Sequence, residues 1–267
     1  MNRRSAAALS HTYMRYLAIG GERIEGPGCR VIRKDAAPIV HDVNHLQVDE
    51  EARPEEALAF LEASLGDRPY RKVYTGSNAP PDLVARLVLE DYVPDPTLQL
   101  LLEGDLEGPP AIPCDIRPVL GDLEWEHLDH LVRADHIETD QKNGTQIYSE
   151  ELTRQMQSVR RWAADHVQFF LARVDDEPVG FFSSWPGVGG LGMVEDLFTL
   201  PSHRNRGIAR ALIHHCVADA RARGAGAVLI GAEVDDTPKA LYAALGFKPT
   251  CVTYGWLKQV SGEAGAA

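Results

Sequence analysis

The chain has 267 residues, of which 44% are hydrophobic and 25% are charged, and its formal net charge at pH 7 is −12. These values are typical of a folded globular protein, so wholesale disorder is excluded, and the length allows one large domain or two small ones. Both halves of the chain are acidic, which argues against nucleic acid as the main partner and favours a cationic substrate such as an amine.

The four cysteines (Cys29, Cys114, Cys216 and Cys251) stand far apart in the sequence. No C-x-x-C pair is present, so neither a zinc ribbon nor a redox motif is supported. The N-terminal apolar stretch is interrupted by His11, Thr12 and Arg15, which makes it a poor signal peptide. No run approaches the ~18 apolar residues that a membrane span needs. We therefore expect a soluble cytoplasmic protein with reduced thiols and no membrane partner.

The first half of the chain alternates between strand and helix patterns. We expect a loose arm or an edge strand over the first 25 or so residues. The apolar patterns then predict strands at 29–34 and within 38–48, a helix at 53–66, a strand at 71–76, a helix at 80–93 and a strand at 97–104. This order indicates an α/β layer. The Gly- and Pro-rich segment 103–113 is the best candidate for a linker.

The second half predicts a mixed α/β fold of its own. The expected elements are a strand at 114–119, a helix from about Leu120, a helix at 149–164, strands at 167–174, 178–186 and 193–200, a helix ending at Gly224, a strand at 227–234, a helix at 238–246 and a strand at 250–260. The predicted domains are residues 1–108 and 109–260. Both halves end in a similar strand–helix–strand order, a weak sign of duplication.

The segment "SHRNRGIARALIHHC", residues 202–216, places a dense group of cations in an acidic protein. It lies between a predicted strand and the first turn of a predicted helix, where unpaired backbone N–H groups and the positive end of the helix dipole face outward. Such a terminus binds phosphate well when a glycine lets the backbone approach. Arg204, Arg206 and Arg210 would add charge to a site suited to a pyrophosphate.

The spacing Arg204-x-x-Gly207-x-Ala209 resembles the acyl-coenzyme A signature of the GNAT superfamily of N-acetyltransferases. The segment "TPKALYAALGF", residues 237–247, resembles the downstream segment of the same superfamily. The resemblance covers roughly residues 112–258 and implies a GNAT-like mixed sheet flanked by helices in the C-terminal lobe. The smaller N-terminal α/β lobe has no equivalent motif. If that lobe shares the fold, we expect a degenerate GNAT-like half that has lost its cofactor site and walls the acceptor pocket.

The resemblance also implies roles for single residues. Backbone groups of Leu197, Phe198 and Thr199 would contact the pantetheine arm of acetyl-CoA, the co-substrate, and no metal is implied. The pyrophosphate would be held by the amides of the loop and helix start, that is by Arg204, Asn205, Arg206, Gly207, Ile208, Ala209 and Arg210. Tyr242 aligns with the tyrosine that protonates the departing thiolate. The family often has an asparagine shortly before this helix, whereas the segment here reads "VDDTPK". Homodimers are common in the family, although no segment of this sequence marks an interface.

Transfer to an amine needs a carboxylate, often acting through water, that removes the ammonium proton. Glu195 is the first candidate because it lies on the predicted strand two positions before Leu197. Asp196 would face the other side of a regular strand, and a bulge would reverse that choice. Glu233, at the end of the next strand, is the third candidate. A backbone N–H of the central strand would stabilise the thioester oxygen.

Each of these residues also has a structural interpretation. The arginines could form a solvated face, Tyr242 could belong to the core, and Glu195 could be an ordinary strand carboxylate. Asp235 and Asp236 are better explained by the turn before Thr237, an expected helix N-cap.

The remaining motifs are better explained by structure. "GVGGLG", residues 187–192, leads into a strand rather than a helix and therefore predicts a flexible hairpin, not a dinucleotide loop. His41 and His45 lack a third ligand for a metal. Two further histidine pairs, His127 with His130 and His214 with His215, fit surface or packing positions.

The sequence therefore predicts an acetyl-CoA-dependent N-acetyltransferase that acts on a primary amine of a small molecule. Two alternatives stay open. One is a non-catalytic acyl-CoA-binding regulatory module, and the other is a protein or peptide N-acetyltransferase.

Overall fold

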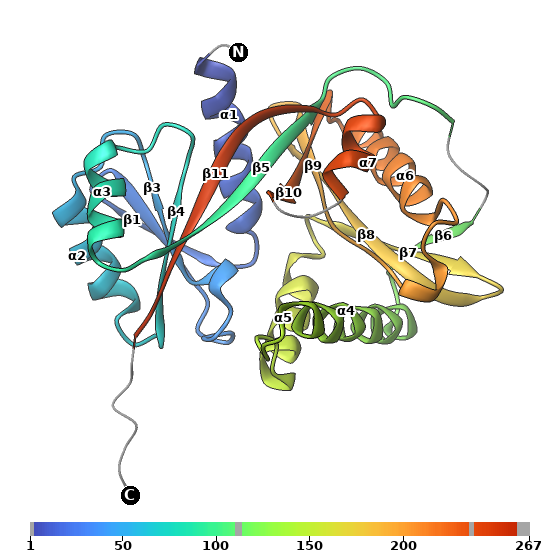
Figure 1. The fold of residues 1–267 in the computed structure, drawn as a ribbon, viewed down its shortest axis with the longest axis horizontal. Coiled ribbons are helices and arrows are strands. Elements are labelled where there is room, and N and C mark those ends of the chain that lie inside the picture. Colours follow the sequence, from blue (N-terminus) through green and yellow to red (C-terminus); the bar gives the residue numbers. More distant parts are fainter. Residues whose placement is uncertain (1–2, 110–113, 235–237, 261–267) are drawn as a thin grey trace, which may run out of the picture. The chain divides into compact units, whose positions relative to one another are not determined.

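The computed structural model describes residues 3–109, 114–234 and 238–260. The chain forms two compact units (Figure 1): unit 1 is Met1–Gln99 with Thr250–Ala267, and unit 2 is Leu100–Pro249. The C-terminal strand belongs to unit 1 because residues 254–259 pair with residues 70–75 in antiparallel register. The domain boundary predicted from the sequence, between residues 108 and 109, stays a prediction. It would assign this C-terminal strand to the second domain.

Unit 1 is a mixed sheet with helices. Its elements are α1 (Arg3–Leu17), β1 (Glu22–Gly26), β2 (Cys29–Arg33), the short η1 (His41–Val43), β3 (His45–Val48), α2 (Pro54–Leu65), β4 (Tyr70–Thr75), α3 (Pro81–Leu89), most of β5 (Val93–Leu102) and most of β11 (Lys248–Gln259). The strand order within the unit is β1-β2-β3-β4-β11-β5. β3 and β4 are parallel, with Val48 opposite Thr75, and the other pairs with a described register are antiparallel.

Residues 3–17 correct the sequence-based expectation of an arm or edge strand, because they form the helix α1, whereas β1 is an edge strand as expected. Ala6, Ala7 and Ala8 are strong helix formers, and the buried Leu9 and Met14 dock the helix onto the sheet of unit 1. The polar residues that interrupt its apolar pattern form contacts within the helix. Thr12, for example, donates its hydroxyl to the carbonyl of Ala8 at 3.0 Å.

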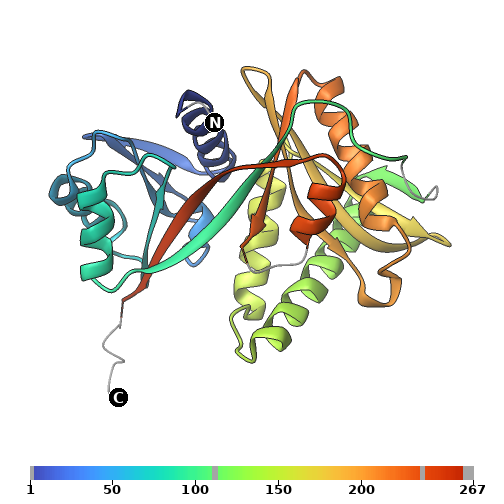
Figure 2. The same ribbon diagram turned by 45° about the horizontal axis from the view of Figure 1, so that its top comes forward.

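The opposite face of the unit 1 sheet carries the apolar core. Leu61 from α2, Leu83 and Leu87 from α3, and Val31 and Leu46 from the sheet are each buried in one cluster. Pro54 begins α2 and Gly66 follows its last residue, as the sequence predicts. α1 therefore covers one face, and α2 and α3 cover the other (Figures 1 and 2).

Unit 2 has the same kind of architecture. Its elements are β6 (Asp115–Pro118), α4 (Asp122–Asn143), α5 (Glu150–Ala163), β7 (Gln168–Val174), β8 (Glu177–Val188), β9 (Leu191–Thr199), the short η2 (Pro201–His203), α6 (Ile208–Ala222), β10 (Ala227–Glu233) and α7 (Pro238–Ala244). The strand order is β10-β9-β8-β7-β6, in which only the β9–β10 pair has a parallel register. α4 and α5 lie on one face of this sheet and α6 lies on the other (Figure 2).

The predicted β8–β9 hairpin of unit 2 is confirmed, and a second hairpin precedes it. Asp175 and Asp176, both with positive φ, turn the chain between β7 and β8. Gly187, Gly189 and Gly190 also have positive φ and turn it between β8 and β9. Since "GVGGLG" opens a strand, it lacks the setting of a dinucleotide loop.

Both units repeat one order of elements. Antiparallel strands lead to a strand, a helix and a second strand parallel to the first, and a further helix and strand follow. These elements are β3, α2, β4, α3 and β5 in unit 1, and β9, α6, β10 and α7 in unit 2, where the strand that follows is β11, most of which belongs to unit 1. The mixed α/β class expected from the sequence is confirmed. None of the helices in the described ranges is long and apolar enough to cross a membrane.

Candidate functional site

The connection from β9 to α6 places the arginine-rich segment as the sequence predicts. Asn205 and Gly207 adopt left-handed backbone conformations, with φ of 61° and 84°. The first hydrogen bond of the helix runs from the N–H of Ala211 to the carbonyl of Gly207 at 3.0 Å. The N–H groups of residues 207–210 thus come before any helical acceptor, at the positive end of the dipole. This arrangement suits an anion.

The three arginines of this segment have different surroundings. Arg204 donates both terminal nitrogens to the carboxylate of Glu138 on α4, at 2.7 and 2.6 Å, and its Nε to the carbonyl of Thr199 at 2.9 Å. Arg206 is exposed and forms no ion pair with any residue that the structure describes. Arg210 makes one weak contact, 3.5 Å from its Nη1 to the carbonyl of Glu107. Arg206 and Arg210 are therefore better placed than the Arg204 side chain to meet an added anion.

The Arg204–Glu138 pair joins the loop to helix α4. The hydrogen bond from Arg204 lowers the pKa of Glu138, with a smaller contribution from Lys142. A bidentate pair of this kind fixes the guanidinium plane as well as its charge. Sequence reasoning missed Glu138 because its partner lies 66 positions away.

A β-bulge interrupts β9 in front of this loop. Phe198 pairs with Phe181 of β8 and Glu195 pairs with Ser183, so that Asp196 and Leu197 together face the single residue Phe182. Asp196 carries the bulge with a φ of 66°. The sequence favours Asp196 over Glu195 as a base only if a bulge occurs here, and the bulge occurs. Both carboxylates remain candidates, and they have different neighbours in the structure.

Glu195 lies where the β9–β10 ladder ends. The register runs as far as Val194 opposite Ile230, although both strands continue. At the next position the N–H of Gly231 donates to Oε1 of Glu195, at 2.9 Å, instead of to the backbone of β9. We call these four residues the β9–β10 fork. Burial, followed by the negative charge of Asp196, raises the pKa of Glu195 to about 8.

Asp196 faces helix α5 and its basic residue Arg160. The Nε of Arg160 lies 3.4 Å from Oδ2 of Asp196. Nearby on α4, burial and the charge of Asp196 raise the pKa of Asp135 to about 6. The structure thus groups Asp135, Asp196 and Glu195 with one arginine. Asp135 and Arg160 were not identified from the sequence, because only tertiary packing brings the two helices to β9.

The predicted pantetheine contacts lie beyond the fork. Leu197 is partly exposed, whereas Phe198 and Thr199 are buried. All three follow the last residue of β9 that pairs with β10. Their backbone groups on that edge are therefore not used by the β9–β10 ladder.

The other predicted catalytic residues lie on the next elements. Tyr242 is buried in α7, with its ring 6.2 Å from that of Phe247. Glu233 is the exposed last residue of β10. Asp235, Asp236 and the expected N-cap Thr237 lie outside the described residues. Within the ranges that are described, no group of three or more His, Cys, Asp or Glu side chains could hold a metal ion.

Comparisons with known proteins agree with this geometry. The model of the acetyltransferase (GNAT) family matches residues 125–247. Among solved structures, a GCN5-related N-acetyltransferase from Kribbella flavida is similar with a TM-score of 0.69 and 18% identity, over 97% of both chains. A tandem GNAT protein from the clavulanic acid biosynthesis pathway is similar with a TM-score of 0.57 and 15% identity, over 96% of both chains.

A functionally unknown conserved protein from Staphylococcus epidermidis is also similar, with a TM-score of 0.70 and 13% identity over 91% of this chain and 95% of that one. No curated protein sequence matches the chain. At these identities the solved structures show a shared fold only, and the family match rests on residues 125–247. The family match identifies residues 125–247 as a GNAT acetyltransferase domain.

Proposed function

We propose that unit 2 is an acetyl-CoA-dependent N-acetyltransferase that acts on a primary amine of a small molecule. The observation that carries this proposal is the β9–β10 fork, in which a basic carboxylate stands where two parallel strands stop pairing. The connection after β9 leads to a glycine-led helix start with two available arginines. The proposed general base on β9 and the proposed anion site at the start of α6 thus follow each other along the chain.

The anionic end of acetyl-CoA fits the start of α6. The N–H groups of residues 207–210 would hold the pyrophosphate, with Arg206 and Arg210 adding charge. Arg204 would act differently from the sequence-based expectation, because Glu138 and the carbonyl of Thr199 already engage its side chain. We assign it the role of holding the loop in shape, while its amide remains a candidate contact.

The pantetheine arm fits the free edge of β9 beyond the fork. Backbone groups of Leu197, Phe198 and Thr199 on this edge would bond to its amides as a strand partner would. The bulge at Asp196 would turn a backbone N–H toward the thioester oxygen.

Glu195 would act as the general base. It has no Lys or Arg partner among the described residues and its pKa is raised, whereas the Asp196 carboxylate is paired with Arg160, so Glu195 is the better candidate. Glu195 would take a proton from the ammonium group of the acceptor, directly or through water. The free amine then forms the N–C bond to the acetyl carbon, the C–S bond breaks, and Tyr242 would give its proton to the sulfur. The surplus proton on the new amide nitrogen would then leave and restore the Tyr242 hydroxyl, so that the products are a neutral amide and the free thiol.

The acceptor is proposed to be a small cationic amine because two further carboxylates, Asp135 and Asp196, lie near the fork. Asp135 and Asp196 lie on the α4 and α5 side of Glu195 and would attract an ammonium group. The four cysteines are free, which agrees with the cytoplasmic location that we keep as part of the proposal.

The test is calorimetric binding of acetyl-CoA to the wild type and to Gly207→Glu, followed by turnover with a panel of small amines. Glutamate at residue 207 puts a side chain and a negative charge where the pyrophosphate would lie. Gly144→Glu is the matched control, since Gly144 is an exposed left-handed glycine with no atom within 4 Å of an added Cβ. We expect the Gly207→Glu variant to lose acetyl-CoA binding and the Gly144→Glu variant to keep it.

The other outcomes separate the alternatives. Binding without turnover of any amine would favour a regulatory acyl-CoA-binding module. Acetylation of peptides at their N-terminal amine, without turnover of small amines, would favour a protein or peptide N-acetyltransferase. No binding to the wild type, or equal binding to the Gly207→Glu variant, would refute the proposed cofactor site.

A further inference from the structure

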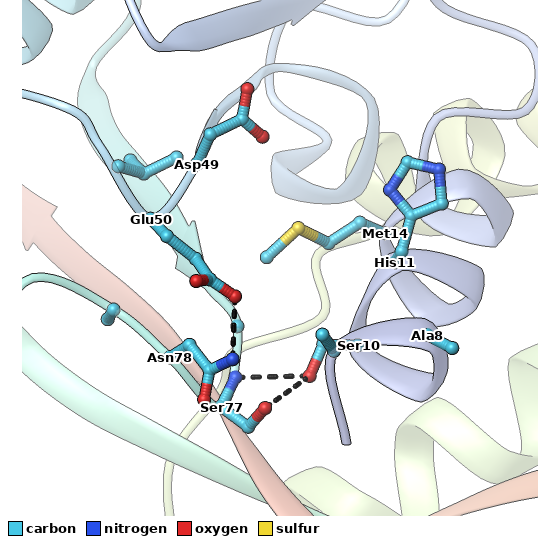
Figure 3. A pocket seen from close by; sticks show the side chains of 12 residues that line it. Ala8, Ser10, His11, Met14, Asp49, Glu50, Ser77 and Asn78 are labelled. Carbon is cyan, nitrogen blue, oxygen red and sulfur yellow. Dashed lines mark hydrogen bonds between the residues drawn. The ribbon is translucent and has the colours of Figure 1, made fainter. Parts of the chain in front are cut away.

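Unit 1 contains a cavity of about 390 Å³ at the carboxyl ends of β3 and β4 (Figure 3). Residues of α1 form one wall, including His11 and Met14, and the segments that follow β3 and β4 form the other. Open α/β sheets commonly bind ligands beyond the carboxyl ends of their parallel strands. The position is therefore a usual one for a binding site.

Hydrogen bonds hold the walls of this cavity in place. The N–H of Ser77 donates to Oγ of Ser10 at 3.0 Å, and that hydroxyl donates to Oγ of Ser77 at 3.2 Å. These bonds tie α1 to the segment after β4. On the opposite side, Nδ2 of Asn78 donates to Oε1 of Glu50 at 2.6 Å (Figure 3). The cavity is thus shaped before any ligand enters.

The charges of the lining side chains do not balance. Asp49 is paired with Arg30, whose Nη2 lies 2.7 Å from each of its carboxylate oxygens. Glu50 has no ion pair with any described residue, and its only described partner is the neutral amide of Asn78. No Lys or Arg side chain lines the cavity. Glu50 therefore leaves one uncompensated negative charge.

The rest of the cavity lining consists of His11 and of neutral side chains. Nε2 of His11 accepts a hydrogen bond from Nε of Arg15 at 2.7 Å, and burial together with that arginine lowers the pKa of His11. Both effects disfavour the charged form of His11. Met14, Val48 and three alanines supply apolar surface. An anion would meet no counter-charge here, whereas a cation with a short apolar body would find both of the contacts that it needs.

We propose that this cavity binds a small organic ammonium compound, with the ammonium group against Glu50 and the carbon chain against Met14. The corresponding connection of unit 2 has opposite chemistry. There the strand is followed by Arg204, Arg206 and Gly207, whereas β3 is followed by Asp49 and Glu50. The proposal does not depend on the function proposed for unit 2.

Methionine methyl NMR tests the proposal on the full chain, which has only four methionines. The probe is n-butylammonium, and sodium butyrate is its anionic counterpart of equal chain length. The Met14 resonance is assigned by its loss in Met14→Leu. We expect n-butylammonium to shift the Met14 methyl in a saturable manner while the buried Met193 of unit 2 stays unchanged. Butyrate and acetyl-CoA should leave Met14 unchanged.

The matched variants are Glu50→Gln and Glu51→Gln. Glu50 lines the cavity, whereas its exposed neighbour Glu51 does not. Loss of one unit charge beside the ligand should weaken n-butylammonium binding about fivefold in Glu50→Gln. Glu51→Gln should bind as the wild type does, and thermal unfolding confirms that both variants are folded. Equal shifts with butyrate, no shift with n-butylammonium, or undiminished binding to Glu50→Gln would each overturn the proposal.

Discussion

Burial of Glu195 and the charge of Asp196 should together set the pH at which the proposed enzyme becomes active. Burial and Asp196 raise the pKa of Glu195 to about 8, and Glu195 works as a base only when it is ionised. Activity should therefore rise with pH and level off above about 8. At two pH units below that value about 1% of Glu195 is ionised, so the rate should be about 100-fold below its plateau.

Asp196→Asn removes the second cause of this shift and keeps the backbone, because asparagine tolerates the left-handed conformation as well as aspartate does. Two unit charges 4 Å apart interact by about 4 kcal/mol at an effective dielectric constant of 20, or about three pKa units. The Asp196 side chain is 39% exposed and lies 3.4 Å from Arg160, which screens most of that energy. We therefore expect the midpoint of the profile to fall by about one pH unit.

The assay is the pH profile of kcat and kcat/KM with one amine, so that the pKa of the acceptor itself is constant. Asp175→Asn is the matched control, because Asp175 is an exposed aspartate with a φ of 51° on the β7–β8 turn. Its profile should match that of the wild type. An Asp196→Asn profile with the wild-type midpoint, or a wild-type midpoint near the ordinary glutamate pKa of about 4.3, would refute this reasoning.

Two further predictions concern the loop and the leaving group. Glu138→Gln should loosen the bidentate hold on Arg204 and raise the KM for acetyl-CoA about tenfold with little change in kcat. Glu126→Gln, on the exposed face of the same helix, is the control, and an unchanged KM in Glu138→Gln would contradict the role of the pair. Tyr242→Phe should lower kcat about 100-fold without weakening acetyl-CoA binding. Unchanged turnover in that variant would instead assign the buried Tyr242 to the core.

Most of the fold could be predicted because its strands and helices carry local signals. Pro54 and Gly66 mark the ends of α2, and glycines mark the β8–β9 turn. The helix α1 was not recognised because His11, Thr12 and Arg15 interrupt its apolar pattern. The membership of β11 in unit 1 could not be read from the sequence either, since its partner β4 lies about 180 residues earlier.

The candidate site also combines features with local sequence signals and features that depend on tertiary packing. The helix start at Gly207 depends on neighbouring residues, so its spacing was visible in the sequence. The bulge at Asp196 depends on how β9 pairs with β8, and the Arg204–Glu138 pair depends on where α4 packs. Sequence reasoning therefore predicted an anion site at this helix start, but it could not assign separate roles to the arginines or settle the choice between Glu195 and Asp196.

The division of charge in unit 2 has a consequence for turnover in the proposed reaction. The anionic donor would be held by arginines and helix amides, whereas the cationic acceptor would be held by carboxylates around Glu195. Acetylation turns the ammonium into a neutral amide and so removes the charge that those carboxylates attract. The product should therefore bind more weakly than the substrate, and its release should be easier. Carboxylates near the fork would thus both attract the amine and let its amide leave.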